Sequence, residues 1–155
     1  MTKSIPPKNI VIYADDDPDD IQLVLDSFSR YSTNVEVITF RDGLQTLSYL
    51  QNIYSIDSLP CLIILDINMP RLDGKETLIK LRQIDVFAET PVVMFTTSFF
   101  PLDPAFAEQY KAGLIKKPLD VRQMELITDQ FIEFCTDDIK RREKECGVCA
   151  GQYAY

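Results

Sequence analysis

The 155-residue sequence contains no histidine. That absence excludes Ser/His and Cys/His nucleophilic triads, the HExxH zinc motif and any phosphohistidine carried by this chain. No apolar stretch approaches the roughly 18–20 residues of a membrane span, and the first residues lack the apolar core of a signal peptide. We therefore expect a cytoplasmic protein with no membrane association, whose chemistry depends on carboxylates, lysine, hydroxyl groups or a bound metal.

The sequence also has no excess of basic residues over acidic ones. The chain has 16 Lys and Arg against 24 Asp and Glu, a formal net charge of -8. Because phosphate binding needs a basic face, we expect no nucleic-acid partner. Four cysteines in a chain of this size do not suggest a secreted disulfide scaffold. A hydrophobic content of 46% and this length fit one globular domain with a proper core.

The prediction of the fold and of the site depends most on one stretch, from Cys61 to Gly74. It begins with the apolar run CLIIL, which is typical of a strand buried on both faces of a parallel sheet, and the run stops at Asp66. Asn68 follows two residues later, and Asp73 with Gly74 indicates a turn that opens the next helix. The carboxyl edge of a central strand is where open α/β sheets place their chemistry.

Short apolar runs alternate with segments of helical periodicity along the whole chain. The pattern predicts strands at 9–14, 35–40, 61–65, 91–96 and 113–116, and helices at 18–30, 43–50, 74–84, 104–111 and from 121 to about 142. This alternation predicts an α/β fold, a flavodoxin-like doubly wound five-stranded parallel sheet of order 2-1-3-4-5 with five helices. We expect a lead at 1–7, the domain at 8–140 and a tail at 141–155.

In that strand order the carboxyl ends of the first and third strands flank one crevice. Asp15 and Asp16 follow the first strand and Asp66 follows the third, so three carboxylates meet there. Three such groups do not all stay ionised cheaply without a cation, and an all-oxygen ligand set favours a hard divalent ion, above all Mg²⁺. The remaining acids nearby are assigned to a solvated rim: Asp17, Asp19 and Asp20.

Two further groups reach the same edge of the sheet. Thr96 ends the fourth strand and Lys117 follows the fifth. A hydroxyl, an ammonium and a metal around one carboxylate form a site for a phosphoryl group in transfer. The central carboxylate of Asp66 can itself be the nucleophile and form an acyl phosphate.

These motifs together resemble the receiver domain of two-component response regulators, over about residues 8–136. The matching pieces, in order, are Ala14-Asp15-Asp16-Asp17, the stretch from Asp66 to Gly74, Thr96, and Lys117-Pro118. The segment DDDPDDIQ, from Asp15 to Gln22, is also similar to small receivers related to phytochrome-partner regulators.

The resemblance implies a role for each site residue. Asp66 is the expected phosphoacceptor. Asp15 and Asp16 are expected to hold Mg²⁺ together with Asp66 and a main-chain oxygen of Asn68. Thr96 is the expected switch hydroxyl. Lys117 is expected to bind the phosphoryl oxygens, and its bond to Pro118 is typically cis in the family.

Two departures from the family pattern lie near the fifth strand. Receivers usually carry Tyr or Phe three residues before the lysine, and this chain has Leu114 there. The segment 112–117 is also shorter than expected, and 99–104 is longer. Both changes fall on the face that receivers use for output, so the output partner is the least transferable feature.

The resemblance implies a single-domain response regulator. A partner histidine kinase or phosphotransfer protein must supply the phosphoryl group in trans, because this chain has no histidine. About nineteen residues follow Thr136, too few for an output domain, so we expect signalling through contact with a downstream protein. A homodimer is compatible with this reading. We expect no enzymatic activity beyond self-phosphorylation and self-dephosphorylation.

Two other classes stay open at the level of sequence. One is a metal-dependent phosphohydrolase of small molecules, although the chain lacks the second acid that such enzymes use for protonation. The other is a constitutive docking module that no longer accepts phosphate, against which the intact acids and lysine argue.

Cys146 and Cys149 form a CxxC pair that could be half of a zinc site. With no histidine in the chain, a zinc site would have to recruit Cys61 and Cys135, both in predicted core elements. We interpret the pair as part of a mobile tail.

Overall fold

The computed structural model describes residues 8–32, 34–53 and 59–146. Its centre is one parallel five-stranded sheet of order β2-β1-β3-β4-β5. The strands are β1 (Asn9–Ala14), β2 (Val35–Phe40), β3 (Leu62–Leu65), β4 (Val92–Thr96) and β5 (Ala112–Lys116). The predicted fold class and strand order are confirmed.

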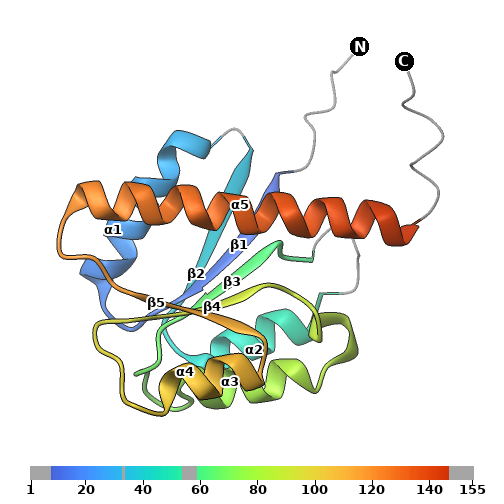
Figure 1. The fold of residues 1–155 in the computed structure, drawn as a ribbon, viewed down its shortest axis with the longest axis horizontal. Helices are drawn as coiled ribbons and strands as arrows, with labels where there is room; N and C mark the ends of the chain where they lie inside the picture. Colours follow the sequence, from blue (N-terminus) through green and yellow to red (C-terminus); the bar gives the residue numbers. More distant parts are fainter. Residues whose placement is uncertain (1–7, 33, 54–58, 147–155) are drawn as a thin grey trace.

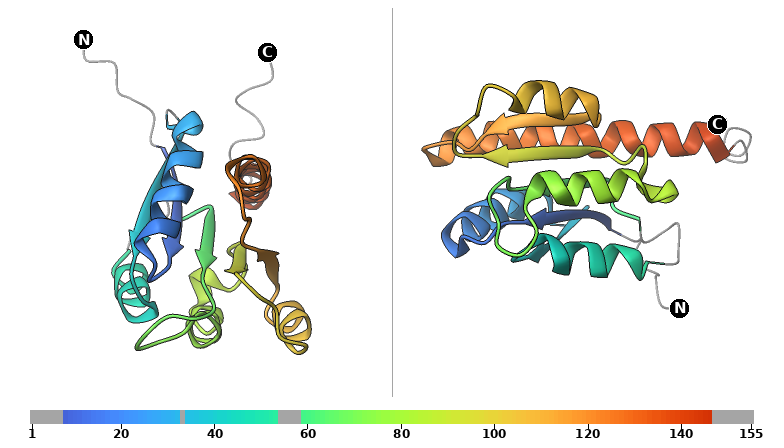
Figure 2. Two further views of the ribbon diagram at one scale, coloured as in Figure 1. Left: turned by 90° about the vertical axis from the view of Figure 1, so that its left-hand side faces the viewer. Right: turned by 90° about the horizontal axis from the view of Figure 1, so that it is seen from below.

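Five helices connect and cover the strands. They are α1 (Pro18–Phe28), α2 (Gly43–Gln51), α3 (Gly74–Arg82), α4 (Asp103–Gln109) and α5 (Val121–Cys146). Single 3-10 turns follow α1 (η1, Ser29–Tyr31) and α3 (η3, Asp85–Phe87). Helices α1 and α5 lie on one face of the sheet, and α2, α3 and α4 lie on the other (Figures 1 and 2). No helix in these described ranges is both long and apolar enough to cross a bilayer.

The core consists of two apolar layers, because successive strand residues point to opposite faces of the sheet. Val11 belongs to the layer under α1 and α5, with Val24 and Phe131, whereas Ile12 belongs to the layer over α2 and α3. All four residues of β3 are buried. A central strand apolar on both faces has to end where the first polar side chain appears, and that side chain is Asp66.

Aspartates fix the beginnings of three helices that follow strands. The side chain of Asp17 accepts a hydrogen bond from the Asp19 N–H and precedes Pro18 at the first helical position of α1. Asp42 and Asp73 cap α2 and α3 in the same way. The predicted helix starts at 18, 43 and 74 are therefore confirmed.

Helix α4 begins at Asp103, one residue before the predicted start at 104. Asp103 is its first residue and not its cap, and the cap position is Leu102. The Asp103 carboxylate is fully buried, accepts the Phe100 N–H at 2.8 Å and forms an ion pair with Lys75 at the start of α3. The side chain turns away from the helix because the partly exposed Lys75 ammonium and a loop amide offer it stronger partners.

Helix α5 is bonded to the sheet as well as packed on it. A disulfide joins Cys61, directly before β3, to Cys135 of α5, with 4.8 Å between the two Cα atoms. The Thr128 hydroxyl also donates to Ser27 of α1 at 2.8 Å. With their sulfur atoms bonded to each other, these two cysteines are not zinc ligands in this structure. Cys149 lies outside the described residues.

Candidate functional site

The three predicted acids meet at the carboxyl edge of the sheet. Ala14 is paired with Leu65, so the residues that follow them, Asp15 and Asp66, leave the sheet at the same level. The Asp66 N–H donates to the Ala14 carbonyl at 2.9 Å, which extends the ladder to the phosphoacceptor candidate itself. One carboxylate oxygen from each of Asp15, Asp16 and Asp66 lies within 4.8 Å of the others. Asp15 and Asp66 are buried, whereas Asp16 is exposed to solvent.

Lys117 enters this acidic group from the end of β5. Its backbone N–H donates to the Thr96 carbonyl at 2.7 Å, which extends the β4–β5 pairing by one residue. Its ammonium lies 2.6 Å from Asp15 Oδ2, 2.8 Å from Asp20 Oδ2 and 3.4 Å from Asp66 Oδ2. The side chain of Lys117 is only 7% exposed, so these ion pairs are shielded from water.

Asp20 is therefore a site residue that the sequence interpretation assigned to the solvated rim. It lies three residues after the cap of α1, in the first helical turn. Nothing in the sequence separated it from Asp17 and Asp19. Only the direction in which α1 leaves the sheet decides which of these acids faces Lys117.

Tyr13 is a second residue that the sequence interpretation missed. Its ring is fully buried beneath α1 and α5, and its hydroxyl donates to Asp15 Oδ2. A buried phenol needs a hydrogen-bond partner, so a tyrosine inside an aliphatic strand two residues before an acid was the available signal. Burial raises the pKa of Tyr13 above its usual range, and the neighbouring Asp15 charge adds to the effect.

The electrostatics of the site centre on Asp66. Burial raises the pKa of Asp66 and the negative charge of Asp15 raises it further, so that it reaches about 7 although Lys117 acts in the opposite direction. Burial alone lowers the pKa of Lys117, but its hydrogen bonds to Asp15 and Asp20 outweigh that effect and the net pKa is raised. The lysine therefore stays charged while Asp66 is poised between its protonated and ionised forms.

The loop after Asp66 packs tightly against it. Asp73 and Gly74 turn the chain into α3 as predicted, and the Gly74 N–H donates to the Ile67 carbonyl at 2.9 Å. A Cβ atom on Gly74 would lie 2.2 Å from the Asp66 carbonyl oxygen. Only glycine allows α3 to begin this close to the phosphoacceptor candidate. Asn68, between them, is exposed to solvent.

Thr96 is the last residue of β4 and is buried at the same edge. Its hydroxyl donates to the Ser98 carbonyl at 3.2 Å, so in this state it is turned toward its own loop. The loop from 97 to 102 exposes Phe99 and Phe100, 45% and 61% respectively. Leu114 of β5 is half-buried and packs against the layer over α2 and α3.

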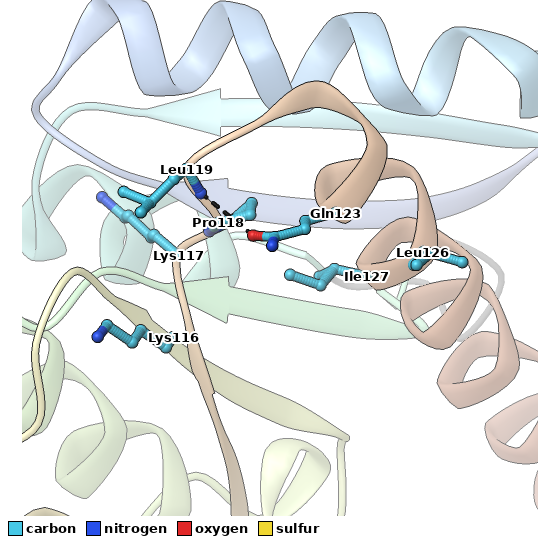
Figure 3. Close-up of a pocket in the computed structure, with 7 residues that line it drawn as sticks. All are labelled: Lys116, Lys117, Pro118, Leu119, Gln123, Leu126 and Ile127. Atoms are coloured by element: carbon cyan, nitrogen blue, oxygen red, sulfur yellow. Dashed lines mark hydrogen bonds between the residues drawn. The ribbon is translucent and has the colours of Figure 1, made fainter.

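The connection from β5 to α5 corrects one expectation. The bond between Lys117 and Pro118 is trans, as is every peptide bond of the described chain. The trans form is the one that X–Pro bonds favour intrinsically, by about 0.5–1 kcal/mol. A pocket of about 380 Å³ also opens here, on the α5 side of the connection, with Leu119, Leu126 and Ile127 in its lining (Figure 3). It is an apolar surface feature and differs in character from the acidic crevice.

Comparison with known proteins agrees with this geometry. A family model described as the response regulator receiver domain matches residues 11–128. Response regulator Rcp1 of Synechocystis sp. is 36% identical over 98 residues, which is 62% of this chain and 66% of Rcp1.

Two solved structures extend the comparison to the fold. The phosphorylated cyanobacterial phytochrome response regulator RcpA has a TM-score of 0.73 and 26% identity, covering 83% of this chain and 94% of RcpA. The Mn²⁺-bound form of response regulator Rcp1 has a TM-score of 0.68 and 25% identity, covering 77% of this chain and 91% of that one. The chain belongs to the response regulator receiver domain family.

Proposed function

We propose that Asp66 accepts a phosphoryl group and that the protein signals through the acyl phosphate. The observation that carries this proposal is the position of Asp66, a buried carboxylate with an ammonium 3.4 Å from its Oδ2 and two further acids beside it. An Asp66 oxygen attacks the phosphorus of the donor, the bond from phosphorus to the donor breaks, and an acyl phosphate forms. Lys117 stabilises the negative charge that spreads over the phosphoryl oxygens.

We propose Mg²⁺ as the cation that completes the site. The donor set fits such an ion, because three carboxylate oxygens converge within 4.8 Å and the charge of Asp15 raises the pKa of Asp66. Asp15, Asp16 and Asp66 would hold the ion, with a main-chain oxygen of Asn68. When bound, it neutralises the acids and polarises the phosphoryl oxygens. The Mn²⁺-bound form of the similar Rcp1 supports a divalent ion.

We propose a histidine kinase, or a phosphotransfer protein charged by one, as the donor in the cytoplasm. The absence of histidine from this sequence and the similarity to phytochrome response regulators support this choice. Thr96, at the end of β4, would turn from the Ser98 carbonyl toward the phosphoryl group and so report its presence to the loop from 97 to 102. A downstream protein, or a second copy of the chain, would read that change.

Incubation with acetyl phosphate and Mg²⁺, followed by intact-mass measurement, tests the function. We expect a single phosphate adduct on the wild type, none on Asp66→Asn, and an unchanged adduct on the control Asp85→Asn, which removes an exposed carboxylate from η3. Adduct formation should be lost with Asp16→Ala or with a chelator. Phosphate on another aspartate of the wild type would contradict the assignment. Turnover of many phosphoesters would favour a phosphohydrolase instead, and no reaction a constitutive docking module.

A further inference from the structure

Lys117 has more acidic partners than a receiver lysine needs for phosphoryl binding alone. An ammonium has three N–H donors, and here its two shortest contacts are to Asp15 and Asp20, at 2.6 and 2.8 Å. Asp66, the candidate that must receive the phosphoryl group, is the most distant of the three at 3.4 Å. In this structure the lysine is held mainly by the two acids that are not the expected phosphoacceptor.

The Asp15 carboxylate already accepts three hydrogen bonds from the protein. Its Oδ2 accepts from both Tyr13 and Lys117, and its Oδ1 accepts the Asp17 N–H at 3.0 Å. A divalent cation bound by Asp15 therefore competes with Lys117 for the same carboxylate charge, whichever oxygen it takes. Cation binding must weaken the shortest contact of the lysine.

Asp20 is placed to compensate for that loss. Its carboxylate lies outside the cluster of Asp15, Asp16 and Asp66 that converges on the metal position. It is 31% exposed and projects from the first turn of α1, where the helix dipole favours a negative charge. Its contact to Lys117 can persist when the cation takes Asp15.

We propose that Asp20 is a positioning residue that keeps Lys117 in the site while the cation occupies Asp15. This inference rests on the proposed function, because it assigns Lys117 to the phosphoryl group and Asp15 to the cation. Without Asp20, the ammonium depends on Asp15 and opposes the incoming cation more strongly. Cation affinity and lysine placement are thus coupled through a residue that touches neither the cation nor the phosphoryl group.

Calorimetric titration of the full chain with Mg²⁺ tests the coupling. We expect Asp20→Asn to raise the dissociation constant about fivefold or more. Asp19→Asn removes the same charge from the adjacent, exposed position and should change the constant less than about twofold. Asp20→Glu, which keeps the charge, should restore most of the affinity. Equal effects of Asp20→Asn and Asp19→Asn would overturn the inference, as would a wild type that binds no Mg²⁺.

A double-mutant cycle distinguishes positioning of Lys117 by Asp20 from a direct attraction between Asp20 and the cation. In a Lys117→Met background, Asp20→Asn should have no larger effect than Asp19→Asn, because there is no lysine left to hold. A full Asp20→Asn effect in that background would mean that Asp20 attracts the cation directly and would refute the proposal.

A second measurement does not depend on the folding of the Lys117 variant. In ¹⁵N-lysine-labelled protein, the Lys117 ammonium signal should stay observable when Mg²⁺ is added to the wild type and should broaden through exchange with water in Asp20→Asn. Persistence of the signal in both proteins would contradict the proposal. The phosphate-adduct assay reports on the function by itself, so failure of the function and failure of this coupling are told apart.

Discussion

The raised pKa of Asp66 has a measurable effect on the stability of the metal-free protein. The folded state favours the protonated carboxyl, since the pKa rises from an ordinary 3.8 to about 7 through burial and the Asp15 charge. Stability from this group is therefore fully present below pH 4 and is lost as the pH rises through about 7. Linkage with these two values gives a loss of about 2 kcal/mol between pH 5.5 and pH 8. For a chain of this size the melting temperature should fall by about 4–8 °C.

The assay is thermal unfolding in the presence of a chelator, for the wild type and for Asp66→Asn. The absence of histidine makes the assay specific for Asp66, because few other groups of this chain titrate between pH 5.5 and 8. The asparagine variant cannot ionise at this position, so it should show little change over the range and should be the more stable protein at pH 8. Added Mg²⁺ should restore the wild type at pH 8. Identical pH profiles for the two proteins would refute the reasoning.

Three further outcomes are expected. Reduction of the disulfide between Cys61 and Cys135, which spans 74 residues of sequence, should lower the free energy of unfolding by about 4 kcal/mol, measured by urea denaturation with and without dithiothreitol. Lys75→Met leaves the buried Asp103 carboxylate without its cation and should cost at least about 2 kcal/mol in the same assay, whereas Lys75→Arg should retain most of it. Hydrogen exchange should change in the loop from 97 to 102 on beryllofluoride binding, and a silent loop would count against the proposed reporting route.

The sheet could be predicted because the sequence marks both ends of each strand. Apolar runs stop at charged or hydroxyl residues, and an aspartate capping the next helix follows β1 and β2 closely. The far end of α5 was harder to place. Its apolar spacing fades near residue 139, but the charged residues that follow are good helix formers, and the helix continues to Cys146.

The candidate site was predictable only as far as strand ends determine it. Asp15, Asp16 and Asp66 converge as expected, because paired parallel strands end at one edge. The partners of Lys117 depend instead on the angle at which α1 leaves the sheet, so Asp20 could not be told from its acidic neighbours.

The disulfide likewise depends on how a helix lies on the sheet. Cys61 and Cys135 meet because α5 crosses the sheet above the beginning of β3, and no local pattern in the sequence encodes that crossing. The trans bond before Pro118 likewise departs from what the family resemblance implied.

The crosslink between Cys61 and Cys135 also makes α5 a lever with a defined fulcrum. Eleven further residues of helix lie beyond Cys135, about 16 Å of axis, and in Figure 1 this end of α5 extends past the strands. A tilt of about 10° around the fulcrum displaces Cys146 by about 3 Å. The other arm, from Val121 to Cys135, begins four residues after Lys117. Because this arm is about 21 Å long, a shift of the lysine end is passed to the opposite end of the helix at about three quarters of its amplitude.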